Sequence, residues 1–156
     1  MKLYLVRHAN AEPAGACGDF ARRLTLQGRL QAQQTGRALR LQGVPVDAVF
    51  SSPAHRAAET AELLAGEFNP SPRLEIVELL YSGAPWEDLL QAMPDLQRAE
   101  SIALVSHLPF IEHLARSLLA ETADLRFLPS ALYGLEFDGP PRPSTGRLSW
   151  VHAPSS

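Results

Sequence analysis

The stretch LVRHANAE (residues 5–12) places an arginine and a histidine directly after an apolar run. Residues 3–6 have the short apolar pattern of a central β-strand. Arg7 and His8 then stand where this strand is expected to end. The pair is either an ordinary polar strand end, or the strand holds two reactive groups in place.

Further apolar runs predict strands over residues 46–50, 74–77 and 102–105. Between them, helices are expected to begin after the N-cap Thr25, with the N-cap Ser52 and Pro53 at the first helical position, and over residues 86–93 and 109–119. In the first of these helices, apolar residues recur at helical spacing up to Gly43, which predicts a buried face and a helix end: Leu26, Leu30, Ala38 and Leu41. Residues 9–23 are rich in Gly, Ala and Pro and are expected to form a loop.

Strands that alternate with helices over the first 120 residues predict a three-layer α/β/α fold, with a mostly parallel central sheet and helices on both faces. Residues 131–137 and 147–151 alternate as strands on either side of DGPPRPSTG, so they are expected to add an antiparallel C-terminal edge. A length of 156 residues favours one domain over residues 1–156.

The composition limits the possible partners. The formal net charge is -3 and no basic run occurs, which argues against a nucleic-acid partner. No segment has the length of a membrane-spanning helix or the pattern of a signal peptide, so a cytoplasmic protein is expected. The single cysteine offers neither a disulfide nor a metal cluster, and no metal or other cofactor is expected. The oligomeric state is left open.

Three crossovers bring charged side chains to one edge of this sheet. Ligands in such folds bind at that edge, beyond the carboxyl ends of the strands. Arg7 and His8 follow the first strand, Arg56 lies in SSPAHR after the second, and His107 follows the fourth. Together with the positive end of the helix after the second strand, they predict a site for a dianion, of which phosphate is the obvious case.

Two histidines at this site suggest chemistry as well as binding. A neutral imidazole can attack phosphorus and form a phosphohistidine, which splits one difficult transfer into two easier steps. Its other ring nitrogen needs an acceptor that fixes the tautomer, and arginines can stabilise the charge on the transferred group. Without catalysis, the same residues would make a phosphate-binding interaction module, which is the alternative of another class.

LVRHA, SSPAHRAAET and LVSHLPF, three ordered segments at matching strand ends, resemble the histidine phosphatase superfamily with its phosphoglycerate-mutase-like fold. The resemblance implies that His8 is the nucleophile and that Arg7, Arg56 and His107 form the phosphate pocket. RRLTLQG, with Arg22, is similar to the SixA-type phosphohistidine phosphatases of this superfamily, although Arg23 stands where proline is usual there.

The substrate is expected to be phosphohistidine in a protein partner, because only about thirty residues lie between Phe68 and Ser101, too few for a lid. A small phosphate ester, processed by a metabolite phosphatase, is the alternative. Three residues keep two interpretations each. Glu78 is a candidate general acid or an exposed or capping glutamate, Arg22 a phosphate ligand or a surface ion pair, and Asn10 a residue of the pocket mouth or of an ordinary loop.

Overall fold

The computed structural model describes residues 1–121 and 123–154, and it contains one six-stranded sheet in the order β3-β2-β4-β1-β5-β6. The strands are β1 Lys2–Arg7, β2 Ala48–Ser51, β3 Arg73–Ile76, β4 Ser101–Ser106, β5 Leu132–Glu136 and β6 Arg147–His152. The first four are mutually parallel, whereas β5 and β6 run antiparallel at one edge. The predicted sheet is therefore confirmed.

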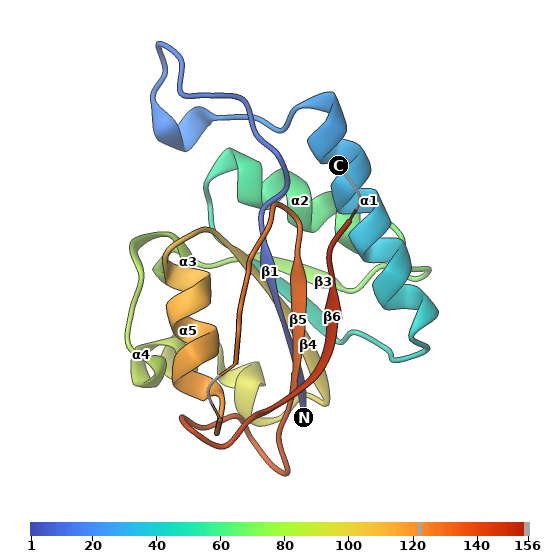
Figure 1. Cartoon of the computed structure of the whole chain (residues 1–156), viewed down its shortest axis with the longest axis vertical. Coiled ribbons are helices and arrows are strands. Elements are labelled where there is room, and N and C mark those ends of the chain that lie inside the picture. The colour runs from blue at the N-terminus through green and yellow to red at the C-terminus, as the bar shows by residue number, and fades with distance from the viewer. Residues whose placement is uncertain (122, 155–156) are drawn as a thin grey trace.

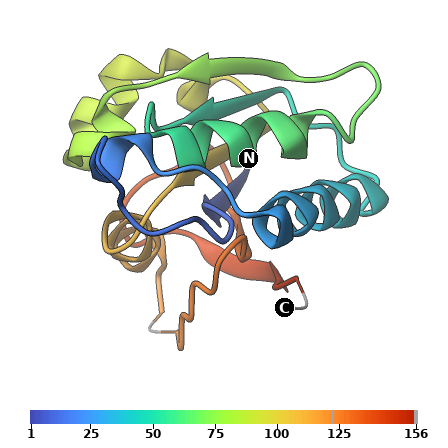
Figure 2. The same cartoon turned by 90° about the horizontal axis from the view of Figure 1, so that it is seen from above.

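Helices cover both faces of this sheet, and Figures 1 and 2 show α1 and α5 on opposite sides of it. The helices are α1 Leu26–Leu41, α2 His55–Ala65, α3 Leu79–Ser82, α4 Trp86–Ala92 and α5 Phe110–Leu118, with the 3-10 helices η1 Asp19–Ala21 and η2 Pro94–Gln97. Alternate residues of β1 enter two separate cores: Leu3 and Leu5 join the α4 and α5 side, and Tyr4 and Val6 join the α1 and α2 side. Across residues 1–121 and 123–154, no helix combines the length and the apolar character needed to cross a membrane.

The apolar face predicted for α1 is wrong. Leu26, Leu30 and Leu41 are 77%, 54% and 71% exposed, and Ala38 is only half-buried. The helix instead buries a row that is mostly small or polar: Gly28, Gln31, Ala32, Thr35, Gly36 and Leu39. Small residues let the α1 backbone approach its neighbours closely, since a Cβ atom at Gly36 would lie 2.6 Å from the carbonyl oxygen of Leu64 in α2. Hydrophobic spacing alone does not reveal such a contact.

Gly28 is where this close approach matters most for the site. A Cβ atom there would lie 2.0 Å from the Asn10 carbonyl oxygen, two residues after His8. Alanine in a helix normally stabilises by up to about 1 kcal/mol relative to glycine. We expect the opposite for Gly28→Ala, a loss of about 2 kcal/mol or more in the free energy of unfolding, because backbone must move. Urea unfolding measures this, with Gly15→Ala as control, since a Cβ atom there meets nothing within 4 Å. A Gly28→Ala variant with a higher free energy of unfolding than wild type would show that the backbone at Asn10 moves away at little cost.

The predicted helix starts are right at α1 and wrong at α2. The Thr25 side chain accepts a hydrogen bond from the Gly28 backbone N–H at 3.0 Å, as an N-cap does. In contrast, α2 begins at His55, and Ser52 and Pro53 precede it. The Ser52 hydroxyl accepts from the Ala54 N–H at 3.2 Å, so it closes a local turn before the helix instead of capping it.

Candidate active site

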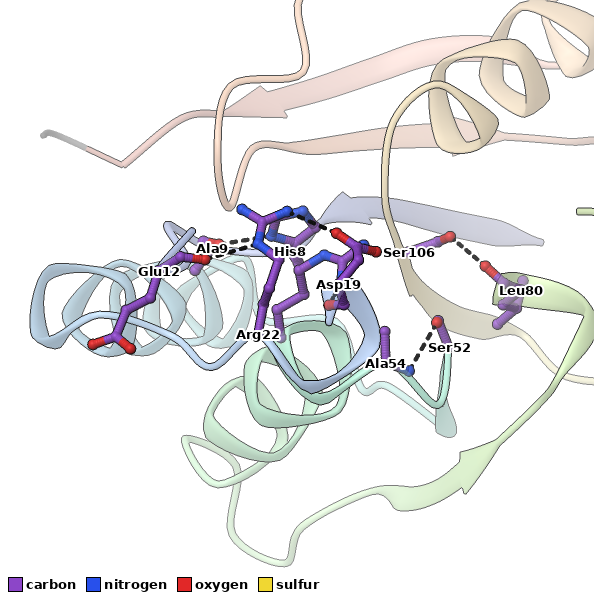
Figure 3. A network of polar contacts seen from close by, with 10 residues as sticks. His8, Ala9, Glu12, Asp19, Arg22, Ser52, Ala54, Leu80 and Ser106 are labelled. Carbon is purple, nitrogen blue, oxygen red and sulfur yellow. Dashed lines mark hydrogen bonds and ion pairs between the residues drawn. The ribbon is translucent and has the colours of Figure 1, made fainter. Parts of the chain in front are cut away.

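The carboxyl ends of the neighbouring parallel strands β1, β4 and β2 lie at one edge of the sheet, where the loop after β1 leaves it in Figure 1. Arg7 and Ser106 are partners at the ends of β1 and β4, and the His8 N–H donates to the Ser106 carbonyl at 2.9 Å. The Ser106 hydroxyl in turn donates to the Leu80 carbonyl at 2.6 Å, which fixes α3 beside the site (Figure 3). A pocket of about 470 Å³ opens here, lined by Arg7, His8, Asp19, Arg22, Arg56, Tyr81, His107 and Leu108.

His8 is buried in this pocket, with 6% of its surface exposed. Its Nδ1 atom lies 2.7 Å from the Ala9 carbonyl oxygen. A carbonyl only accepts, so Nδ1 carries the proton and Nε2 keeps its lone pair. Burial lowers the pKa of His8 to about 3, the hydrogen bond with Ala9 opposes this, and the charges of Arg56 and Arg7 add to the lowering. The imidazole is therefore neutral at physiological pH and can act as a nucleophile.

Two arginines flank His8, and protein oxygens hold both. Arg7 Nη1 donates to the Phe127 carbonyl at 2.8 Å, and burial lowers the pKa of Arg7. Arg56, only 5% exposed, donates from Nη1 to the Asp19 carbonyl at 3.0 Å and from Nη2 to the Asp19 carboxylate at 3.1 Å. These contacts fix the direction of each guanidinium group before any ligand arrives.

Several buried nitrogen atoms in the pocket residues lack a protein partner. Within residues 1–121 and 123–154, four buried side-chain nitrogens have none, and three of them belong to this pocket: Arg7 Nε, Arg56 Nε and His107 Nε2. A buried polar group without a partner is costly, so these nitrogens are available to contact a ligand bound in the pocket. An anion with several oxygens, such as a phosphoryl group, would supply acceptors to both guanidinium N–H groups.

His107 completes the ring of nitrogen groups. It is half-buried, and the edge of Tyr81 packs against it with ring centroids 5.4 Å apart. Burial lowers its pKa, the charge of Arg56 lowers it further, and a hydrogen bond with the Leu108 backbone and the charge of Asp19 oppose the shift. His107 is therefore mostly neutral in the free protein at neutral pH. A bound dianion would raise its pKa again.

Sequence reasoning missed Asp19 and Tyr81. Asp19 lies in η1, within the stretch expected to be a loop, and it contacts Arg56 of α2 across 37 positions of sequence. Its spacing of three from Arg22 was the one available signal, because that spacing brings the two side chains together in a helical turn. Tyr81 lies in the short helix α3, for which the sequence pattern gave no indication.

The three residues with two interpretations separate in the structure. Arg22 lines the pocket, where its Nε donates to the Glu12 carbonyl at 2.7 Å and its Nη1 to Asp19 at 3.3 Å. Asn10 accepts a hydrogen bond from the Thr25 hydroxyl at 2.9 Å and does not line the pocket. Glu78 is exposed at the start of α3, outside the lining residues. The Glu12 carboxylate points away from His8 in Figure 3.

The chain is similar in sequence and in fold to known proteins. The sequence model of the histidine phosphatase superfamily (branch 1) matches residues 3–81. The phosphohistidine phosphatase SixA of Escherichia coli (strain K12) is 26% identical over 160 residues, which cover 99% of this chain and 94% of that protein. A SixA homolog of Haemophilus influenzae is 28% identical over 156 residues, covering 89% of this chain and 90% of that protein.

A solved structure of the protein histidine phosphatase SixA, complexed with tungstate, superimposes with a TM-score of 0.84. It is 24% identical, and the match covers 98% of this chain and 97% of that one. This likeness shows that the two chains share a fold.

Proposed function

This chain belongs to the histidine phosphatase superfamily, and we propose that it removes phosphate from phosphohistidine in a protein partner through a phosphohistidine intermediate on His8. The observation that carries the proposal is a buried, neutral His8, with Nδ1 held by Ala9, in the same pocket as Arg7 and Arg56, whose Nε–H donors lack a protein partner. We assign phosphate binding to Arg7, Arg56 and His107, and a supporting contact to Arg22.

In the first step, the lone pair of His8 Nε2 forms a bond to phosphorus while the bond from phosphorus to the substrate nitrogen breaks. The electron pair of the broken bond stays on the substrate ring. In the loose transition state, the charge of the transferred group is spread over its three equatorial oxygens, where the guanidinium groups of Arg7 and Arg56, fixed beforehand by Phe127 and Asp19, can stabilise it.

In the second step, a water oxygen bonds to phosphorus and the bond to Nε2 breaks. The Nδ1 proton of His8 stays on the ring throughout, because Nδ1 donates it in a hydrogen bond to the Ala9 carbonyl oxygen 2.7 Å away. With phosphorus on one nitrogen and a proton on the other, the ring is an imidazolium. The ring leaves as neutral imidazole when the electron pair of the broken bond returns to Nε2. The attacking water keeps both protons, so phosphate is released as H2PO4⁻ and then loses a proton to solvent.

The structure around the pocket supports a side chain of another protein as substrate. Residues 69–100 form β3, α3, α4 and η2, and Leu80, Trp86 and Leu89 of this segment are buried in the core. Tyr81 is the residue of this segment that lines the pocket. The segment is therefore packed into the fold, and a phosphorylated side chain can approach the pocket from outside.

Turnover of a phosphohistidine protein by the full chain, in the presence of excess chelator, tests the proposal. We expect phosphate release with a value of kcat/KM well above those for sugar phosphates and nucleotides. Faster turnover of a small ester would favour a metabolite phosphatase, and binding of phosphate without any turnover would favour an interaction module. Strict dependence on added metal would contradict the mechanism.

A further inference from the structure

Asp19 is a carboxylate in a pocket that is otherwise built to attract an anion. Its Oδ2 atom lies 3.1 Å from Arg56 Nη2, its Oδ1 atom lies 3.3 Å from Arg22 Nη1, and its backbone carbonyl accepts from Arg56 Nη1. The side chain is 54% exposed, so it stands at the mouth of the pocket and not at its base. A negative charge so close to a dianion costs binding energy unless another part of the substrate uses it.

The protonation state of Asp19 limits what it can do. Partial burial by itself raises the pKa of its carboxyl group, but the hydrogen bond and charge of Arg22 and the charge of Arg56 outweigh burial and hold the pKa below its usual range. Asp19 is therefore ionised at neutral pH. An ionised carboxylate accepts hydrogen bonds and cannot give a proton to a leaving alkoxide.

An imidazole leaving group, unlike an alkoxide, does not always need a proton donor as its bond to phosphorus breaks. When the substrate ring carries a proton on the nitrogen that is not bound to phosphorus, it leaves as neutral imidazole and requires no proton in that step. The substrate ring must, however, keep this proton until the bond to phosphorus breaks, because the unprotonated ring would have to leave as an anion. An ionised carboxylate at the pocket mouth favours the protonated ring, since an opposite charge within a few ångströms stabilises the charged form.

We propose that Asp19 is a specificity-determining residue, which accepts the ring N–H of a protonated phosphohistidine and so selects this leaving group over that of a phosphate ester. This inference rests on the proposed function. In the transfer, His8 Nε2 gains the bond to phosphorus, the substrate nitrogen keeps the electron pair, and the proton facing Asp19 remains on the substrate ring. Asp19 would then accept a hydrogen bond from the substrate ring, as the Ala9 carbonyl accepts one from Nδ1 of His8.

An aromatic wall beside Asp19 fits a ring in this position. Phe20, the next residue, is 40% exposed and packs edge-on against Tyr81, with ring centroids 5.2 Å apart. Tyr81 in turn packs edge-on against His107 and lines the pocket. Aromatic rings interact favourably in such edge-on or offset arrangements, and an imidazolium gains further from an aromatic face.

The test replaces Asp19 with asparagine, which keeps the shape and removes the charge. The substrates are a phosphohistidine protein and phenyl phosphate, whose leaving phenol has a pKa near 10 (about that of tyrosine) and brings no proton. For D19N we expect kcat/KM to fall with both substrates, because Arg56 loses its ion pair, but to fall roughly 10- to 100-fold further with the phosphohistidine protein than with phenyl phosphate. The alkaline limb of the phosphohistidine pH profile should also shift to lower pH, because the variant no longer favours the protonated ring.

Glu12→Gln is the matched control, because it removes one negative charge from the same loop, where only the Glu12 backbone contacts Arg22. It should leave the ratio of the two kcat/KM values unchanged. Equal losses on both substrates in D19N would mean that Asp19 merely positions Arg56, and equal gains that it merely competes with phosphate. Either result overturns the assignment while the proposed function stands. A wild-type protein inactive on the phosphohistidine protein overturns the proposed function itself, and the assignment with it.

Discussion

Replacing His8 with alanine is expected to lower kcat/KM for a phosphohistidine protein by on the order of 10⁴-fold or more, because the proposed nucleophile is lost and no neighbour can take its place. The other histidine of the pocket, His107, follows β4, is only half-buried, and is assigned to phosphate binding in this proposal. Rapid quenching of the wild-type reaction in base, followed by mass spectrometry, should find phosphate on His8.

The fold should survive this substitution, which makes the loss of activity interpretable. The His8 backbone keeps its two hydrogen bonds, from its N–H to Ser106 at 2.9 Å and from the Ser130 N–H to its carbonyl at 3.0 Å. His113→Ala on the exposed surface of α5 is the matched control and should retain full activity. Turnover within tenfold of wild type in a folded His8→Ala protein would exclude His8 as the nucleophile.

The part of the site that sequence could predict is the part that the sheet determines. Apolar runs locate the strands, and parallel strands bring their carboxyl ends to one edge, so Arg7, His8 and His107 had to lie near one another. Arg56 followed from its position one residue into the helix after β2. The register that pairs Arg7 with Ser106 realises this expectation in the structure.

The parts that sequence could not predict depend on contacts between segments far apart in the chain. The place of Asp19 is determined by how residues 9–23 fold over α2, and no periodic pattern encodes that path. The buried face of α1 is determined by close backbone contacts at Gly28 and Gly36, which override the spacing of its leucines. Glu78 was a candidate acid by its position after β3, yet it is exposed outside the pocket.

Acidification should destabilise the protein through His8 well before its carboxyl groups are protonated. The pKa of His8 is about 3 in the folded protein, against 6.5 for the ordinary group. Between these two pH values, His8 is protonated in the unfolded chain but neutral in the folded protein. The contribution of neutral His8 to the free energy of unfolding is therefore fully present above about pH 6.5 and decreases as the pH falls. From neutral pH to about pH 4, this single group should cost the folded state about 3 kcal/mol.

Urea unfolding at a series of pH values would measure this loss, with His8→Asn as the variant that cannot titrate at this position. The free energy of unfolding of wild type should fall about 3 kcal/mol further than that of the variant over this range. His107 and His152, whose pKa values are also lowered, are present in both proteins, so their effects cancel in the difference. Asp19 acts in a separate range, because its lowered pKa means that the stability it contributes is lost only as the pH falls below 3.8. Parallel curves for the two proteins would mean that folded His8 takes up a proton near its ordinary pKa, which would contradict the lowered pKa that burial and the neighbouring arginines imply.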